Sequence, residues 1–534
     1  MVTHFNPLKS VWYAVQISIA LLLVSTTIGA LFVLYARAGH FGSVDIFIRK
    51  AAVFVGIQAV LSTILSVTLG LLCAKILYRF SFSRTRIFEY SLALPIVFPI
   101  ISAITGLLDV WGNNGWLMAL TKTIFSSNST HHSNIYGLYG ILLAHIFFNF
   151  PLATKYFLHR FWDIPKESMF LAHQFHFGFW DNWKHLEKPA VIPVIPRVAA
   201  IIFLFCISSF TIIMVLGGGP AAATPELMIY QALRMEFNLP KMGTASFVHS
   251  GLALLPVLIL IVTTRQFPLL PPENTAGSQK NYQFLKISPW FLIIPAGLFL
   301  LLIYAPIIKM VTSGLATWFL PEFWQKTLIQ ASIKSLNIAC MAVVIGAFLL
   351  FCLICLSLCI YKRFGKIAGK LSEIPAFLPL IVSPVTMGTS LILITATRPY
   401  IIESWHTLLI AFINAITFLP IGFALVMPRV LDINDHWFFL QESLHCSSVI
   451  RIAKIYIPLA KHSISLFLGL IAGFSLSDLT TISVLGYTET PTLPLLVLRQ
   501  MSNYHFQWAS GTALLLVCLC VIVFTIFKRY GTYD

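Results

Sequence analysis

Long apolar stretches alternate with shorter polar segments along the whole chain. A helix that crosses the hydrocarbon core of a bilayer needs about 20 mostly apolar residues. Twelve stretches meet this requirement, at residues 11–36, 52–78, 88–111, 136–158, 194–216, 243–264, 289–311, 330–360, 371–396, 403–427, 461–486 and 508–528. The first of them is too long for the core of a signal peptide. The pattern therefore predicts an all-α integral membrane protein with about twelve transmembrane helices.

The composition supports this interpretation and excludes a soluble globule. Hydrophobic residues make up 58% of the chain and charged residues only 10%, whereas a soluble domain carries about 25% charged residues. The net charge of +16 could suggest nucleic acid, but the basic residues are dispersed along the chain. They follow a membrane topology instead, and we expect no nucleic-acid partner.

The distribution of lysine and arginine predicts the orientation. Cytoplasmic segments of membrane proteins are enriched in these residues. If the N-terminus is cytoplasmic, the segments on that side hold 24 of the 35 lysines and arginines. This assignment places both termini in the cytoplasm and requires an even number of helices, which agrees with twelve.

The sequence also repeats itself at an offset of 269 residues. Pro151 is matched by Pro420 at this offset, and Pro189 by Pro458, in a register without gaps over some 75 residues. We therefore predict a first repeat at residues 1–264, a cytoplasmic linker at 265–288 and a second repeat at 289–534. Six helices in each half make the two repeats parallel in the membrane.

The centre of each repeat is a polar loop after its fourth helix, at residues 160–190 and 429–458. In both loops a Phe-Leu pair is followed by an apolar residue, a histidine, twelve further residues and a proline. This pattern resembles the Glu-Ala-Ala loop in the permeases of bacterial ABC importers. Phenylalanine stands where that family has its leading glutamate, and histidine where it has glycine, in both copies.

The resemblance implies that these loops couple the permease to two copies of a separate ATP-binding subunit. The positions that match the family motif are Phe170, Leu171, Ala172, Phe175, His176 and Pro189 in the first loop, and Phe439, Leu440, Gln441, Leu444, His445 and Pro458 in the second. The chain has no Walker A sequence, so we expect it to be no enzyme, to have no cofactor of its own and to leave ATP hydrolysis to the partner.

Other segments resemble the permeases of thiamine importers in particular. The run at residues 137–151, the Leu-Gly-Gly-Gly-Pro run at 216–220 and the segments at 475–478 and 492–496 carry this likeness. It implies a multi-pass protein of the bacterial inner membrane that carries thiamine or its phosphates, with a periplasmic solute-binding protein as a further partner. The fused ferric-iron importer permeases share the architecture and remain an alternative.

One acidic residue inside a predicted span stands out. A carboxylate in a membrane is expensive and usually functional, and Asp478 lies within the eleventh predicted helix. It could contact a cationic substrate, or it could be hydrogen-bonded to Ser475, Thr481 or a neighbouring helix; its repeat counterpart is Ser209. We predict no metal site.

A transporter of another class remains an alternative to the ABC permease. Secondary transporters of the six-plus-six kind also have parallel halves and a central cytoplasmic linker. They do not need a matched amphipathic loop of about 30 residues within each half. The sequence therefore favours the ABC permease.

Overall fold

The structure is a computed structural model in which every regular element is a helix within the ranges described here. It describes residues 7–38, 45–79, 98–113, 115–117, 135–263, 297–395, 399–436, 452–486 and 491–531, together with Leu92 and Pro95. Exposed apolar side chains such as Phe32, Val262 and Val344 cover its sides. An apolar surface of this kind is suited to lipid rather than water, so the prediction of an all-α integral membrane protein is confirmed.

Each of the twelve predicted spans contains helix. Eight helices in the described part of the chain include a stretch long and apolar enough to cross a bilayer. They are α1 (Pro7–Ala38), α2 (Ile46–Arg79), α7 (Leu138–Trp162), α14 (Leu239–Thr263), η6 with α16 (Phe299–Tyr304 and Ala305–Trp318), α17 (Lys326–Leu371), α20 (Pro399–His436) and α27 (Phe506–Gly531).

The other four predicted spans are shorter or interrupted. The third contains α5 (Ile100–Trp111), and the fifth divides into α11 (Ile195–Ile207) and α12 (Phe210–Leu216). The ninth consists of α18 (Ile374–Phe377) and η8 (Leu378–Leu380), then α19 (Pro384–Thr395), with a bend of 82° before α19. The eleventh divides into α24 (Lys461–Ser477) and α25 (Thr480–Leu485).

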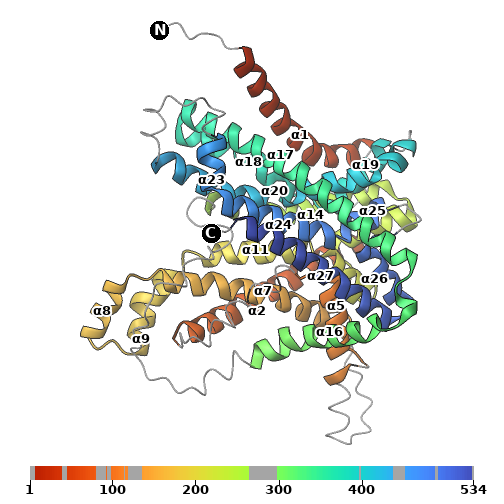
Figure 1. The fold of residues 1–534 in the computed structure, drawn as a ribbon, viewed down its shortest axis with the longest axis horizontal. Helices are drawn as coiled ribbons and strands as arrows, with labels where there is room; N and C mark the ends of the chain where they lie inside the picture. Colours follow the sequence, from red (N-terminus) through yellow and green to blue (C-terminus); the bar gives the residue numbers. More distant parts are fainter. Residues whose placement is uncertain are drawn as a thin grey trace, which may run out of the picture.

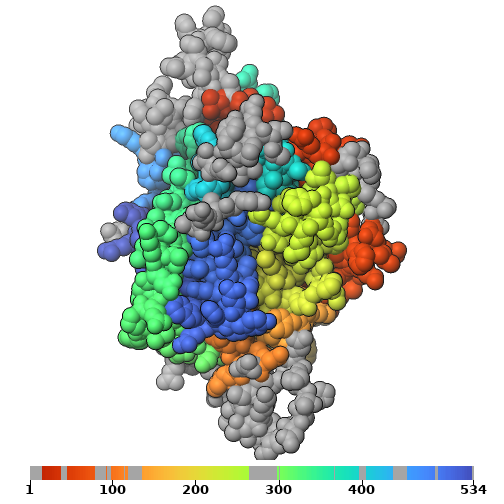
Figure 2. Space-filling model, turned by 90° about the vertical axis from the view of Figure 1, so that its right-hand side faces the viewer, coloured from red at the N-terminus to blue at the C-terminus, as the bar shows by residue number. Residues whose placement is uncertain are grey.

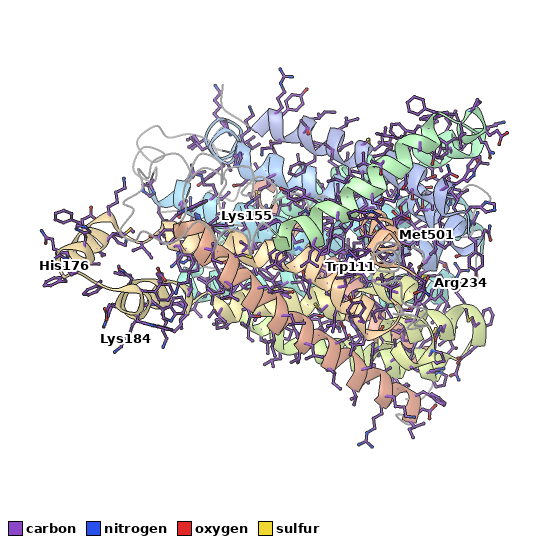
Figure 3. The ribbon with its side chains drawn as sticks, turned by 90° about the horizontal axis from the view of Figure 1, so that it is seen from below. Trp111, Lys155, His176, Lys184, Arg234 and Met501 are labelled. Atoms are coloured by element: carbon purple, nitrogen blue, oxygen red, sulfur yellow. The ribbon has the colours of Figure 1, made fainter. Side chains whose placement is uncertain are left out.

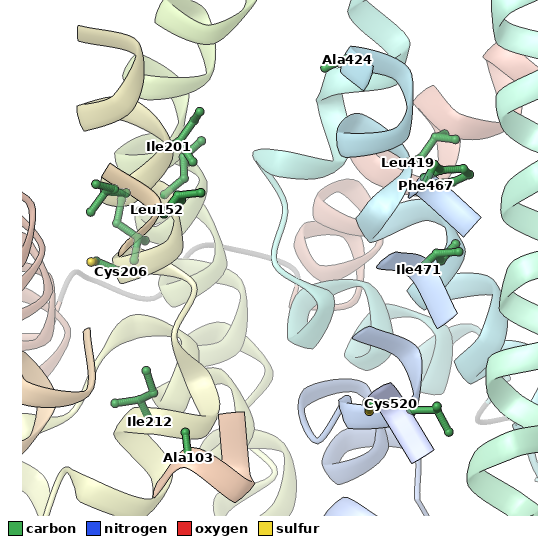
Figure 4. Packing of buried hydrophobic residues seen from close by; sticks show 14 of the residues in the cluster. Ala103, Leu152, Ile201, Cys206, Ile212, Leu419, Ala424, Phe467, Ile471 and Cys520 are labelled. Atoms are coloured by element: carbon green, nitrogen blue, oxygen red, sulfur yellow. The ribbon is translucent and has the colours of Figure 1, made fainter. Parts of the chain in front are cut away.

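The two halves have matching elements at the offset of the sequence repeat. The end of α12 at Leu216 corresponds to the end of α25 at Leu485, and each helix is followed by a glycine. The short helix α13 (Pro225–Gln231) likewise corresponds to α26 (Leu493–Ser502). Figure 4 shows labelled core residues in two groups, with Leu152 and Cys206 in the first half and Leu419 and Phe467 in the second.

The halves are joined by an exchange of their first helices. Helix α1 packs against α19 of the second half, and α16, near the start of the second half, packs against α5 of the first. Figure 1 shows both contacts, with α1 beside α19 and α16 beside α5. On the face drawn in Figure 2, yellow-green segments from the end of the first half lie directly beside blue segments from the end of the second. The interface between the halves therefore involves helices from both ends of each repeat.

Candidate functional site

The loop that follows α7 is a small helical structure at one end of the molecule. It contains α8 (Lys166–Gln174), α9 (Phe179–Asn182), η1 (Trp183–Glu187) and α10 (Lys188–Val191). Helices α8 and α9 extend beyond the ends of the neighbouring long helices (Figure 1). We call residues 163–191 the first loop.

The first loop presents large apolar side chains to the outside. Of the residues that match the motif, Phe170 and Leu171 are half exposed, Phe175 is 71% exposed, and only Ala172 is buried. Trp180, which the motif does not include, is 74% exposed. Exposed lysines and histidines lie among these side chains, at positions 166, 173, 176, 184, 185 and 188. An apolar patch with a basic rim is typical of an interaction surface.

His176 ends α8 in a conformation that favours glycine. Its φ is 52°, in the left-handed region. The N–H of Phe177 donates to the carbonyl of Ala172 at 2.9 Å, and the N–H of His176 to that of His173 at 3.1 Å. These two bonds are those of a Schellman motif, in which the left-handed residue is usually glycine. The histidine that replaces the family's glycine therefore lies at the position where the backbone favours glycine.

The first loop is held to the membrane-spanning body by α2. The Nζ atom of Lys75 lies 3.4 Å from Oε2 of Glu187 and 4.1 Å from the ring centroids of Phe179 and Trp183. The hydroxyl of Tyr78 donates to the sulfur of Met169 at 3.2 Å. Two residues near the end of one long helix thus position both the α8 and the η1 parts of the loop.

The structure describes the second loop only in part. Pro458 lies in the short helix α23 (Ile457–Leu459), directly after η9 (Ile452–Tyr456). The other predicted coupling residues of this loop are outside the described residues: Phe439, Leu440, Gln441, Leu444 and His445.

Asp478 lies in a break between two helices, so its predicted place inside the eleventh helix is wrong. Helix α24 ends at Ser477 and α25 begins at Thr480. The Oδ1 atom of Asp478 accepts hydrogen bonds from the N–H groups of Thr480 and Thr481, at 2.9 and 3.3 Å. These bonds satisfy free N–H groups at the start of α25, and a carboxylate is favourable at a helix N-terminus.

A buried polar group surrounds this break. The hydroxyl of Thr481 donates to Oδ1 of Asn414 at 3.1 Å, and Nδ2 of Asn414 donates to Oγ of Ser475 at 3.0 Å. Ser475 and Thr481 therefore contact Asn414, and the printed hydrogen bonds of the aspartate go to backbone N–H groups. The structure brings together the residues that the sequence analysis considered around Asp478, in a different arrangement.

Glu226 is the acidic residue that the sequence analysis missed. It lies in the first turn of α13, is 1% exposed and accepts a hydrogen bond from the hydroxyl of Ser383 in the second half. The segment between the fifth and sixth predicted spans was treated as a connection, so its carboxylate was not considered. The signal was present in the sequence, since Pro225 and Glu226 are followed by Leu-Met-Ile, a short apolar helix start.

Taken together, the lipid-facing surface, the paired halves and the helix breaks at buried polar groups define a multi-pass membrane protein of the transporter type. No family model matches the chain.

Comparison with known proteins gives a more specific likeness. The chain is 28% identical over 537 residues to the thiamine transport system permease protein ThiP of Escherichia coli, covering 99% of this chain and 98% of that protein. The proteins of the same name from Brucella abortus and Haemophilus influenzae are 29% identical over 94% of this chain and 28% identical over 99% of it. The resemblance to thiamine permeases, predicted from short segments, is thus confirmed over nearly the full length.

Proposed function

We propose that this chain is the membrane-spanning permease subunit of an ABC importer that carries thiamine, or its phosphates, from the periplasm to the cytoplasm. The observation that carries the proposal is the similarity to thiamine permeases over 99% of the chain. A match of this extent includes both halves and the first loop, so it is not limited to a shared helix pattern. The chain itself is then a transporter subunit and no enzyme.

The proposed orientation places the first loop in the cytoplasm and the protein in the bacterial inner membrane. Figure 3 shows His176 and Lys184 at one end of the molecule, and Trp111, Arg234 and Met501 toward the other. The positive-inside rule assigns the first of these ends, together with both termini, to the cytoplasm. The second end then faces the periplasm, where a solute-binding protein would deliver the substrate.

The first loop is proposed to bind an ATP-binding subunit, and the second loop a second copy of it. A few aromatic anchors usually dominate such an interface, and Phe170, Phe175 and Trp180 are the exposed aromatic side chains available. One chain offers two loops, so a single permease chain is sufficient for two ATPase subunits. ATP would then be hydrolysed only in the partner.

A double variant tests this contact. Phe170→Asp combined with Phe439→Asp should abolish substrate-stimulated ATP hydrolysis in the assembled transporter, while the permease still inserts into the membrane. Phe364→Asp is the matched control, because Phe364 is also 66% exposed but lies at the end of α17, outside both loops. Normal stimulation in the double variant would contradict the assignment of the loops.

Uptake of radiolabelled thiamine tests the function itself. Cells that lack this gene should take up thiamine poorly, and the restored gene should return uptake to the wild-type rate. Uptake of ferric iron, measured in the same cells, should not change. A defect in iron uptake with normal thiamine uptake would replace the proposed substrate.

A further inference from the structure

Three interrupted spans meet at the contact between the two halves. The breaks lie at Ser208–Ser209 before α12, at residues 381–383 before α19, and at Asp478–Leu479 before α25. Helix α19 of the second half packs against both α13 and α25, and so joins the three regions. Interrupted helices at membrane depth are tolerated where they are buried in protein or line a path through it.

The first half contributes the carboxylate of Glu226 to this contact. The hydroxyl of Ser383, at the break before α19, donates to Oε1 of Glu226, and the backbone N–H of Phe210 donates to the same carboxylate. The other oxygen, Oε2, is buried and has no hydrogen-bond partner among the residues that the structure describes. One oxygen is therefore fixed and the other is free to accept.

The second half contributes the carboxylate of Asp478 in the same manner. Its Oδ1 atom is bound by the N–H groups of Thr480 and Thr481. Its Oδ2 atom is buried, and within the described ranges it also lacks a hydrogen-bond partner. The two carboxyl groups interact electrostatically, so they lie close enough to act on the same ligand.

The two residues have equivalent roles although they are not repeat counterparts. The counterpart of Asp478 is Ser209, whose hydroxyl donates to the carbonyl of Cys206 at 2.8 Å and so turns away from the start of α12. Glu226 instead accepts from the N–H of Phe210, the first residue of α12. Each half thus places one carboxylate at the N-terminus of its second half-helix.

We propose that Glu226 and Asp478 form a two-carboxylate site for an organic cation at the contact between the halves. The inference rests on the proposed transport function and extends it from one acidic residue to a pair. A fixed positive charge would be attracted to the two free oxygens, strongly so in a water-poor environment. The protein donors that hold the other oxygens disperse the negative charge, so the site attracts the cation without preventing its release.

The experiment uses the complete transporter in proteoliposomes and compares two substrates. Glu226→Gln, Asp478→Asn and the double variant keep the shapes of the side chains and their accepting oxygens but remove the charges. Each single variant should lower thiamine uptake about tenfold or more. Uptake of an uncharged analogue, in which the thiazolium ring is reduced, should change much less. Glu226→Asp, which keeps the charge, should restore part of the uptake.

Asp109→Asn is the matched control. Asp109 is a partly buried carboxylate in α5 that accepts a hydrogen bond from Ser510 at 3.3 Å, and it takes no part in the proposed site. This variant should transport both substrates normally. Membrane abundance of every variant is measured at the same time, so that loss of protein is not read as loss of transport.

Two results would overturn the site. One is normal thiamine uptake at normal abundance in the double variant, and the other is an equal loss of the charged and uncharged substrates, which would indicate a structural role. Thermal unfolding of the purified full chain with added thiamine separates this proposal from the proposed function. If the wild-type transporter failed to import thiamine but showed a thermal shift that the double variant lost, the function would fail and the site would stand.

Discussion

At the scale of single residues, the backbone of His176 provides a direct prediction. The left-handed conformation costs an L-residue about 1 kcal/mol more than glycine, and His176 adopts it with a φ of 52°. His176→Gly should therefore stabilise the end of α8 by about 1 kcal/mol. Hydrogen exchange of the amides in residues 169–177 should become slower by up to about fivefold.

A glycine elsewhere in the same helix serves as the control. His173 is exposed and helical within α8, where glycine is unfavourable by roughly 1 kcal/mol. His173→Gly should accelerate exchange in the segment that His176→Gly slows. The same direction of change in both variants would show that the left-handed conformation of residue 176 is not the cause.

Lys75 gives a second prediction at this scale. Its side chain is 15% exposed and that of Glu187 5% exposed, so Lys75→Met leaves a buried carboxylate without this cation and also removes two ring contacts. Loss of one partner from a buried pair costs about 3 kcal/mol. The first loop should then detach from α2 and be cleaved faster by chymotrypsin at its aromatic residues. Lys184→Met, which changes an exposed lysine in the same loop, should leave the cleavage rate unchanged.

The sequence predicted some of these residues and missed others for physical reasons. Phe170 and Phe175 could be found because a motif at fixed spacing marks them. Asp478 could be found because it interrupts a long apolar stretch. Glu226 could not be found by the same test, because α13 has only seven residues and is too short to be taken for a span. Its burial depends on α19 of the other half, which no local pattern encodes.

At the scale of elements, two glycines in α2 predict opposite results. A Cβ at Gly70 would lie 2.5 Å from Cβ of Ala153 and 2.9 Å from the backbone N of Thr154 in α7, whereas nothing lies within 4 Å of a Cβ at Gly56. Small residues let membrane helices approach closely. Gly70→Ala should destabilise the protein by about 1–3 kcal/mol through overpacking, seen as a lower melting temperature in detergent.

Gly56→Ala is the matched change in the same helix. It should leave the melting temperature unchanged or raise it slightly, because alanine favours helix by up to about 1 kcal/mol over glycine. Equal destabilisation by both alanines would contradict close packing of α2 on α7 as the cause.

Hydropathy located the helices but not their interruptions. The fifth predicted span, at 194–216, is continuous in apolar character, yet the helix breaks at Ser208–Ser209. The break is stable because Glu226 and Gln58 supply partners from elsewhere, the latter donating to the carbonyl of Cys206 at 2.9 Å. Since these partners come from distant segments, a window along the sequence cannot reveal the break. The polar residues of α17 and α2 likewise gave no sign of where those long helices would end.

At the scale of the whole molecule, Arg234 connects the halves at the end opposite the first loop. Its Nη2 atom donates to the carbonyls of Ser483 and Val484 in α25, at 3.1 and 2.7 Å. Hydrogen bonds to a charged group contribute about 1.5–3 kcal/mol. If this contact helps to close the periplasmic side, Arg234→Met should raise ATP hydrolysis in the absence of substrate several-fold in the assembled transporter.

Lys241→Met provides the comparison at the same end of the molecule. Lys241 pairs with Glu236 at 2.7 Å within the first half, and an exposed pair of this kind contributes little. Its removal should leave basal hydrolysis at the wild-type rate. If both variants raised basal hydrolysis alike, the effect would come from lost positive charge and not from the connection between the halves.

The repeat was the whole-molecule feature that the sequence predicted best. Residues near each break follow the offset of 269 because both copies fold by the same local rules, from α11 and α12 to α24 and α25. The exchange of first helices could not be predicted in this way. It depends on which surfaces of the two halves fit together, and such surfaces are chosen by packing between segments hundreds of residues apart.

That exchange also has a consequence for the synthesis of the protein. The hydroxyl of Ser390 in α19 donates to the carbonyl of Ala30 in α1, across a separation of 360 residues. A ribosome that adds about 5–20 residues per second needs roughly 20–70 s to make the intervening chain. During this time α1 lies in the bilayer without its second-half partner, which its 23-residue apolar stretch Val15–Arg37 allows. The earliest helix to leave the ribosome is therefore among the last to reach its final neighbours.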